Sequence, residues 1–415
     1  MTGFERRGPS LVCDGVSLEQ AAAAHGTPLY VYSRDAIVEA YGTYTTAFAT
    51  IPHRVCYAVK ANGAGAILRL FAGLGAGADI VSGFEMRAAL RAGFPRERIV
   101  FSGVGKTEGE IAAGLDAGIG EFNAESEDEI ARLSALARPR GRRAALTLRV
   151  NPDIDARSHP YISTGLRDNK FGVDIAAAPA ILDRARRLPG IEVVGVQCHI
   201  GSQIRSLEPL REAVAALVDL TRRLLADGYL LRTIDIGGGL GINYEEGTGP
   251  DVREFAALVV PLLRGLDLTV LLEPGRSLVA RAGALLTRVL YVKENHGKRF
   301  VIVDAGMNDL LRPALYKAHH RIEPVAARGR ESRLVDVVGP VCETSDAFAR
   351  DRELETVEPG DLLVVRDTGA YGFAMASTYN MRPRPAEVMV EEGRVRLIRR
   401  RETFEDLVHS ETDGA

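Results

Sequence analysis

Few features of the sequence suggest a metal-bound, disulfide-bonded or nucleic-acid-binding protein. The cysteines number only four in 415 residues, are far apart and form no C-x-x-C pair, which argues against a zinc site or a disulfide framework. They are Cys13, Cys56, Cys198 and Cys342. Basic residues are not in excess, because the formal net charge is −3, and nucleic-acid binding needs a basic surface. We therefore expect no bound metal and no nucleic-acid partner.

Long apolar runs are also missing. The most apolar long stretch, 255–272, is interrupted by Arg264 and Asp267, so we do not expect it to span a membrane. The first residues, MTGFERRGPS, lack the apolar segment of a secretory signal. We therefore expect a cytoplasmic globular protein with no membrane partner.

The chain does contain a regular alternation of short apolar runs and longer amphipathic stretches, such as 178–188 and 210–225. Strands that alternate with helices favour a parallel sheet, and a count of eight favours a closed (β/α)8 barrel over the alternative, a doubly wound open sheet. The eight candidate strands are 56–60, 78–82, 98–103, 120–126, 145–150, 193–199, 233–239 and 269–275.

The pattern changes near residue 280. Segment 285–306 is typical of two strands joined by a His-Gly turn, and 360–369 and 386–398 alternate or turn at glycine. We therefore expect a second, antiparallel β domain, a sandwich or barrel, after the (β/α)8 barrel. The long connection 151–172 is predicted to be a functional loop, because structured loops of that length often are.

Groups that can do chemistry follow several of the predicted strands. Active groups gather at the C-terminal ends of barrel strands. Here the first, sixth and eighth strands end near Lys60, His199 and Glu273. The loops after strands seven and eight hold GGGLG (237–241) and EPGR (273–276), and glycines there let backbone N–H groups approach a phosphate. Each group alone has a commoner structural explanation, so the prediction depends on their convergence at one rim.

Two other patterns are weaker. GVGKTEGE (103–110) contains the Gly-Lys-Thr of a phosphate-binding loop, but Val100 stands where that pattern needs a glycine. The pair His319-His320 has no third ligand at helical spacing, so we expect a pair at the surface rather than a metal site.

A lysine and a phosphate cradle at one rim meet the needs of pyridoxal phosphate. Its aldehyde forms a Schiff base with a lysine, its phosphate needs a cradle, and its ring nitrogen needs a partner. Glu273 suits the ring nitrogen, and the imidazole of His199 can stack on the ring face.

The motifs also resemble those of a known family. YAVKAN, GADIVSGFE, HPYISTGL, CHIGSQI, GGGLGI, EPGRSLVA, VDAGMNDLLRPALY, GPVCET and GAYGFAMASTYNMRPRPAEV are similar to bacterial diaminopimelate decarboxylases, in the same order and over roughly residues 10 to 405. The resemblance implies the alanine-racemase-like fold, with a pyridoxal-phosphate-binding barrel over 29–280. It also implies a β domain formed by 1–28 with 281–415.

The resemblance implies a role for each matched residue. Lys60 binds the cofactor covalently, His199 stacks on its ring and Glu273 pairs with the ring nitrogen. The expected phosphate and cofactor contacts are Ser202, Gly238, Gly239, Pro274, Gly275, Arg276 and Tyr371. The expected substrate contacts are Arg276, Arg312, Tyr316, Glu343 and Tyr371. Cys342 is the implied proton donor, and its segment enters the site from the partner subunit of a homodimer.

The implied reaction is decarboxylation of meso-2,6-diaminopimelate to L-lysine, the last step of lysine biosynthesis. Arg312 suits the distal carboxylate of this substrate and Glu343 its distal ammonium. Phe84, KANGAG (60–65) and YNMR (379–382) depart from the usual family pattern. Two alternatives to the implied function stay open. One is a related decarboxylase of another amino acid, free or carrier-tethered, and the other is a non-catalytic protein that binds pyridoxal phosphate.

Overall fold

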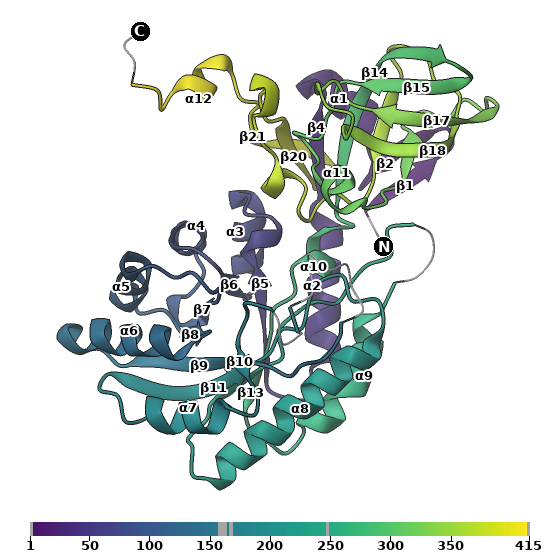
Figure 1. Cartoon of the computed structure of the whole chain (residues 1–415). Helices are drawn as coiled ribbons and strands as arrows, with labels where there is room; N and C mark the ends of the chain where they lie inside the picture. The colour runs from purple at the N-terminus through teal and green to yellow at the C-terminus, as the bar shows by residue number, and fades with distance from the viewer. Residues whose placement is uncertain (1–2, 157–163, 166–168, 246–248, 413–415) are drawn as a thin grey trace. The chain divides into compact units, whose positions relative to one another are not determined.

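The computed structural model describes the chain except residues 1–2, 157–163, 166–168, 246–248 and 413–415 (Figure 1). The chain divides into two compact units. The barrel unit comprises Ala40–Asn243 and Gly247–Ser277, and the sheet unit comprises Met1–Glu39, Tyr244–Glu246 and Leu278–Ala415. In the described chain, no helix combines the length and apolar character needed to cross a bilayer.

The barrel unit contains a closed barrel of eight parallel strands, as the alternating pattern predicted. Each strand pairs with the next, and the last pairs with the first through Val270 and His53, which excludes the open-sheet alternative. The strands are β5 (His53–Ala58), β6 (Gly77–Ile80), β7 (Ile99–Phe101), β8 (Glu121–Ala124), β9 (Ala144–Asn151), β11 (Ile191–Gln197), β12 (Thr233–Asp235) and β13 (Thr269–Leu272). A two-residue strand, β10 (Val173–Asp174), pairs with the end of β9.

Helices connect these strands and cover the outside of the barrel (Figure 1). They are α3 (Gly65–Gly73), α4 (Gly83–Ala92), α5 (Glu108–Ala117), α6 (Glu127–Ala137), α7 (Ala178–Ala185), α8 (Leu207–Ala226) and α9 (Val252–Leu263), and α2 (Arg34–Ala47) precedes β5. Serine or threonine caps the first N–H groups of several, because a side-chain oxygen there replaces the missing helical acceptor. Ser82 and Ser126 accept from the backbone N–H groups of Glu85 and Glu129, and Thr107 forms a capping box.

Most of the barrel strands end slightly earlier than the sequence predicted. The first ends at Ala58, and Lys60 lies in the following 3-10 turn, η1 (Val59–Ala61). The sixth ends at Gln197, two residues before His199, and the eighth at Leu272, directly before Glu273. The candidate side chains therefore lie on the loops just beyond the strands, where parallel barrels place their active groups.

The sheet unit is built on a separate β-sheet, which confirms the predicted second fold. Its strand order is β18-β17-β15-β14-β4-β20-β21, and β19 pairs with β14 and β16. The strands are β4 (Leu29–Ser33), β14 (Gly283–Asn295), β15 (Lys298–Val303), β16 (Ile322–Pro324), β17 (Ser332–Val338), β18 (Ala347–Glu355), β19 (Leu362–Val365), β20 (Ala386–Glu391) and β21 (Arg394–Arg399). A smaller sheet, β1 (Phe4–Arg7), β2 (Ser10–Cys13) and β3 (Val16–Ser17), leads into α1 (Leu18–His25).

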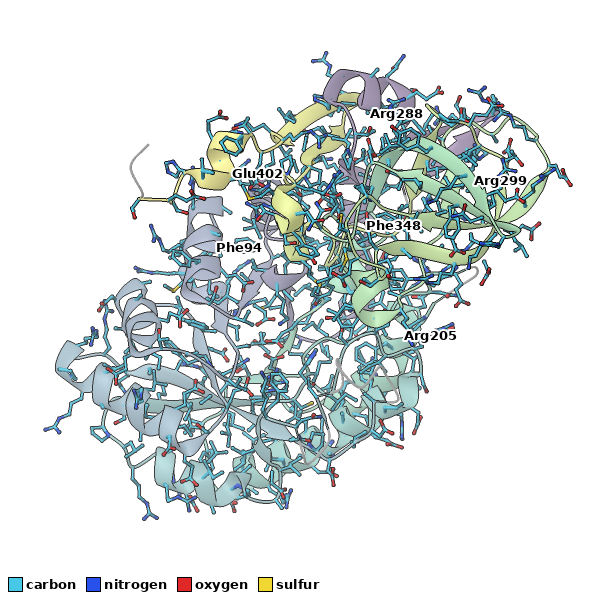
Figure 2. All side chains as sticks on the ribbon, turned by 45° about the horizontal axis from the view of Figure 1, so that its top comes forward. Phe94, Arg205, Arg288, Arg299, Phe348 and Glu402 are labelled. Atoms are coloured by element: carbon cyan, nitrogen blue, oxygen red, sulfur yellow. The ribbon has the colours of Figure 1, made fainter. Side chains whose placement is uncertain are left out.

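Two features of the sheet unit differ in detail from the expectation. Most pairs are antiparallel, but β15 pairs with β17 and β20 with β4 in parallel. Residues 29–33, expected in the barrel, form β4, because all five side chains are buried where this strand pairs with β14 and β20. As expected, early residues belong to this unit: Leu11 and Leu18 pack with Val364 and Val388 in one apolar core. Figure 2 shows the side chains, including the buried Phe348 of β18.

Candidate active site

Lys60 is anchored at the barrel mouth by a buried carboxylate. Its Nζ donates to Oδ2 of Asp79 at 2.6 Å, and the Asp79 side chain is fully buried while that of Lys60 is 36% exposed. The other oxygen, Oδ1 of Asp79, is buried and has no hydrogen-bond partner among the residues that the structure describes. The lysine is therefore a positioned amine and not a freely solvated end of a strand. Asp79 was missed from the sequence, although an acid inside the apolar run of GADIV was a signal.

His199 is held as a neutral ring. Its Nδ1 accepts from the backbone N–H of Gly238 at 3.2 Å, so the proton of the neutral ring lies on Nε2. Burial, assisted by the charges of Arg149 and Lys60, lowers the pKa of His199 well below its usual range. A neutral imidazole of fixed tautomer suits a stacking contact better than an imidazolium beside a lysine.

Glu273 lies in a polar network inside the barrel. Its Oε2 accepts from Nε2 of Gln197 at 3.0 Å, and its side chain interacts directly with that of Asp235. Burial and the Asp79 carboxylate raise the pKa of Glu273 to about 7, against the charge of Lys60. Burial and Glu273 raise the pKa of Asp235 well above its usual range. Two buried carboxyl groups this close share a proton, because both cannot carry a charge cheaply.

The loops after β11, β12 and β13 approach one another too closely for side chains. A Cβ added to Gly238 would lie 2.2 Å from the carbonyl oxygen of Glu273, and one on Gly239 would lie 2.4 Å from that of Gly201. Nη2 of Arg276 donates to Oγ of Ser202 at 2.9 Å, and this hydrogen bond joins the loops after β11 and β13. Backbone, hydroxyl and guanidinium groups are thus gathered on neighbouring loops, an arrangement suited to an anion.

The backbone also connects Lys60 to this region. The N–H of Ala58, at the end of β5, donates to the carbonyl oxygen of Pro274 at 3.1 Å. A Cβ on Gly275 would lie 2.9 Å from the Cβ of Ala61. The loops just beyond the barrel strands therefore carry the residues that the sequence singled out in this unit. They are Lys60, His199, Ser202, Gly238, Gly239, Glu273, Pro274, Gly275 and Arg276.

The remaining candidates belong to the sheet unit. Arg312 begins α11 (Arg312–Tyr316) and is buried, with its guanidinium 4.4 Å from the centre of the Tyr244 ring. Cys342 is the one exposed cysteine, and its backbone N–H donates to Oδ1 of Asn380 at 3.0 Å. Glu343 is exposed and accepts from the hydroxyl of Ser345.

Tyr379, Tyr371 and Tyr316 complete the candidates of the sheet unit. Tyr379 hydrogen-bonds to Glu343, which raises the pKa of the phenol. Tyr371 has a φ of 56°, a left-handed backbone conformation that is uncommon for a tyrosine, and its side chain is half-buried. Tyr316 ends α11. The acid Glu343, the thiol of Cys342 and the phenol of Tyr379 therefore form one exposed polar cluster, and Tyr379 was not singled out from the sequence.

Two weaker sequence patterns, GVGKTEGE and the His319-His320 pair, can be compared with the structure, and the predicted loop 151–172 can be compared only in part. Lys106 of GVGKTEGE is buried and donates to the carbonyl oxygens of Gly103 and Asn123 and to Glu129, so its amine serves the fold. The prediction of a surface His319-His320 pair is wrong, because the His320 side chain is fully buried. Among the residues with described positions, no three metal-ligating side chains converge. Residues 157–163 and 166–168 of the predicted functional loop 151–172, and with them most of HPYISTGL (159–166), lie outside the described residues.

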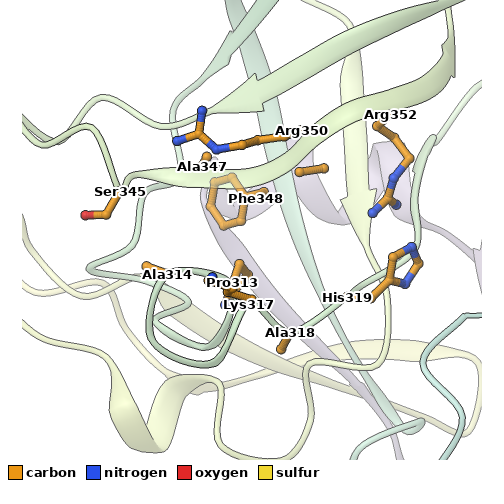
Figure 3. Close-up of a pocket in the computed structure, with 11 residues that line it drawn as sticks. Pro313, Ala314, Lys317, Ala318, His319, Ser345, Ala347, Phe348, Arg350 and Arg352 are labelled. Atoms are coloured by element: carbon orange, nitrogen blue, oxygen red, sulfur yellow. The ribbon is translucent and has the colours of Figure 1, made fainter.

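His319 faces a pocket of about 570 Å³ between α11 and β18 (Figure 3). Phe348 and short apolar side chains line it together with Arg350, Arg352 and Lys317. Nη1 of Arg352 donates to the backbone carbonyl oxygen of His320 at 2.8 Å. This hydrogen bond holds the segment that follows α11 against β18.

The families and structures that this chain resembles are consistent with a cofactor site at the barrel mouth. Residues 34–280 match the model of a family described as pyridoxal-dependent decarboxylase, pyridoxal binding domain. The fold and the groups at the barrel mouth thus define a decarboxylase that uses pyridoxal phosphate as its cofactor.

The relatives that match over the full length narrow this class. The diaminopimelate decarboxylase of Aquifex aeolicus is 48% identical over 99% of this chain and 97% of its own length. That of Neisseria meningitidis serogroup A is 50% identical over 97% of this chain and 99% of its own length. The crystal structure of the Helicobacter pylori enzyme, complexed with L-lysine, is 46% identical with a TM-score of 0.91, covering 94% of this chain and 98% of that one. The chain belongs to the diaminopimelate decarboxylase family.

Proposed function

We propose that the chain removes one carboxyl group of meso-2,6-diaminopimelate to give L-lysine and carbon dioxide, and that Lys60, His199, Glu273 and Arg276 hold the cofactor for this reaction. The observation that carries the proposal is the convergence of these four side chains on loops that follow parallel strands of one barrel. Full-length relatives with this activity support the choice of substrate.

The residues at the barrel mouth fit the cofactor. Lys60 supplies a primary amine beside a buried Asp79, and the unpartnered Oδ1 of Asp79 shows that the polar groups here are not all satisfied by the protein. The region around Gly238 and Gly239, with Ser202 and Arg276, suits the phosphate. The carboxyl of Glu273 suits a ring nitrogen, and a partner of that kind stabilises its charged form against the burial that now raises its pKa.

Each residue has a separate task. The cofactor held by Lys60, His199 and Glu273 would supply an electron sink for the pair released at the substrate's α-carbon. Asp79 orients the amine of Lys60 and stabilises its protonated form. His199, held neutral by burial and by the Gly238 N–H, offers a flat, uncharged face. Pro274 and Gly275 keep the Glu273 loop close to the end of β5.

The sheet unit supplies substrate contacts and the returning proton. Arg312 pairs with the distal carboxylate and Glu343 with the distal ammonium, while Tyr316 and Tyr371 contact the substrate and Tyr371 also the phosphate. Cys342 donates a proton to the α-carbon after decarboxylation, acting as a general acid. The thiol is exposed in the single chain, as a group that reaches a partner's site would be. We infer a homodimer in which the Cys342 segment serves the site of the other subunit.

A direct assay tests the proposal. Purified protein loaded with pyridoxal phosphate is given meso-diaminopimelate, L-lysine, L-ornithine and L-arginine in parallel, and carbon dioxide and amine products are measured. We expect L-lysine from diaminopimelate and little release from the others, because only diaminopimelate offers Arg312 a distal carboxylate. Preferential turnover of a monocarboxylate would instead favour a related decarboxylase of another amino acid. Cofactor binding without any turnover would favour a non-catalytic role.

A further inference from the structure

His320 contacts Arg312 directly inside the sheet unit. The two side chains are buried, and Nη1 of Arg312 lies 2.9 Å from Nε2 of His320. The other ring nitrogen, Nδ1, lies 2.7 Å from the backbone carbonyl oxygen of Arg366. The place of His320 beside the guanidinium indicates a role in holding Arg312.

The two contacts determine where the proton of His320 lies. A carbonyl oxygen only accepts, so Nδ1 must carry a proton and donate it to Arg366. A guanidinium only donates, so Nε2 must be the unprotonated nitrogen that accepts from Arg312. The ring is therefore neutral and of fixed tautomer, with its position set by the backbone.

Tyr244 forms the second side of this arrangement. The centre of its ring lies 4.4 Å from the guanidinium carbon of Arg312. The centres of the Tyr244 and His320 rings are 5.0 Å apart, and the ring planes are inclined at 66°. The imidazole nitrogen and the aromatic face are both uncharged. Neither of these two contacts neutralises the guanidinium, whereas a carboxylate in either position would compete with a substrate carboxylate.

We propose that His320, with Tyr244 as a supporting face, is a positioning residue that aims Arg312 at the distal carboxylate and so determines specificity for a dicarboxylic diamino acid. The proposal rests on the proposed function, since it assumes that Arg312 meets that carboxylate. Aiming a binding group affects ground state and transition state alike, so losing it raises KM and leaves kcat nearly unchanged.

Two matched substitutions separate aiming from packing. In His320→Gln the side-chain oxygen can replace Nε2 as the acceptor for Arg312, while in His320→Asn the amide nitrogen can replace Nδ1 as the donor to Arg366. We expect His320→Asn to raise KM for meso-diaminopimelate about tenfold with kcat within about twofold, as for a lost hydrogen bond to a charged group. We expect His320→Gln to restore KM to within about threefold of wild type. His296→Asn, in the exposed turn after β14, is the control.

Inhibition gives a second readout that packing would not produce. L-Lysine keeps one carboxylate, and 1,5-diaminopentane has none. In His320→Asn we expect L-lysine to inhibit about tenfold more weakly, with inhibition by 1,5-diaminopentane changed less than about twofold. Tyr244→Leu, which removes the aromatic face, should show the same selectivity at about threefold and serves if His320→Asn does not fold.

The outcomes distinguish this inference from the proposed function. A wild-type protein that releases no carbon dioxide from meso-diaminopimelate overturns the proposed function and, with it, this inference. An active wild type whose Asn and Gln variants lose thermal stability equally, and bind both inhibitors equally, overturns the inference alone. The selective loss in Asn with recovery in Gln supports it.

Discussion

The barrel unit and the sheet unit hold their candidate groups in different ways. In the barrel unit Lys60, Glu273 and Arg276 all hydrogen-bond to other side chains of the same unit, and the latter two are buried. In the sheet unit Arg312 is buried, but Cys342 and Glu343 are exposed.

The difference is consistent with the roles proposed for these groups. Groups that hold a cofactor in one orientation benefit from preorganisation by neighbouring side chains and backbone. A thiol that delivers a proton to the substrate must instead be presented outward. The barrel unit is therefore expected to supply most of the cofactor contacts, with Tyr371 as the exception, and the sheet unit to contribute groups that meet the substrate. The predictions below test this division, beginning with the largest effect.

Removing the amine of Lys60 should abolish the function of the barrel mouth. We expect Lys60→Ala to lower kcat/KM at least about a thousandfold and to lose the visible absorption of the bound cofactor, because the covalent attachment is gone. The substitution also leaves Asp79 buried without its ammonium, so the melting temperature should fall. Lys60→Arg keeps a charge but has no primary amine, and should be equally inactive.

An exposed lysine provides the control for this prediction. Lys293→Ala, on β14, should retain activity and absorption. Full turnover by either Lys60 variant would refute the assignment of the barrel mouth as the cofactor site.

The second prediction tests whether Cys342 acts on the partner subunit. Lys60→Ala and Cys342→Ala are each expected to be nearly inactive alone. In a mixed dimer, one site would collect both substitutions and the other neither. Random exchange of equal amounts yields about half mixed dimers with one intact site of two, so activity should return to roughly a quarter of wild type.

Subunit exchange must be shown first, by co-purification of an untagged variant with a tagged one. Exchange without recovered activity would mean that Cys342 serves its own chain's site or is not the acid. A chain that stays monomeric and active would contradict the shared-site arrangement altogether.

The sequence predicted the architecture well because its signals are local. All eight barrel strands were found within a few residues, since each is a short apolar run bounded by helical or glycine-rich segments. The rim residues were found by one geometric rule, that active groups follow the strands. Their individual roles stay predictions, because composition and spacing do not report contacts.

The polar barrel interior was missed for a physical reason. Strands buried on both faces do not alternate, so their pattern does not say which residues point inward. Asp79, Asn123 and Gln197 were thus not recognised as neighbours of Lys60 and Glu273. His320 was assigned to the surface together with His319 because no third ligand stands at helical spacing. The segment after α11 (Arg312–Tyr316) has no periodicity that would have indicated its burial.

The third prediction concerns specificity and the sheet unit. Arg312→Ala should lower kcat/KM for meso-diaminopimelate roughly ten- to a hundredfold, the value of a charge-assisted pair of about 1.5–3 kcal/mol. The loss should appear mainly in KM, with the cofactor absorption unchanged, because the barrel mouth is intact. Arg333→Ala, at an exposed position of β17, is the control. Equal losses on monocarboxylic and dicarboxylic amino acids would show that Arg312 does not meet the distal carboxylate.

The smallest effect tests the shared proton inside the barrel. The pKa of Glu273 is raised by burial in the cofactor-free protein, to about 7, above its ordinary value of 4.5. A raised folded-state pKa means that the stability contributed by the protonated form is complete below the ordinary value and is lost as pH rises towards 7. Glu273→Gln cannot ionise, so its melting temperature relative to cofactor-free wild type should increase between about pH 5 and about pH 7.5. The exposed Glu254→Gln, on α9, should show no such trend. Loading with pyridoxal phosphate should diminish the trend, because a protonated ring nitrogen stabilises the Glu273 carboxylate. A difference that stays flat with pH would mean that Glu273 ionises in the folded protein as easily as in the unfolded chain.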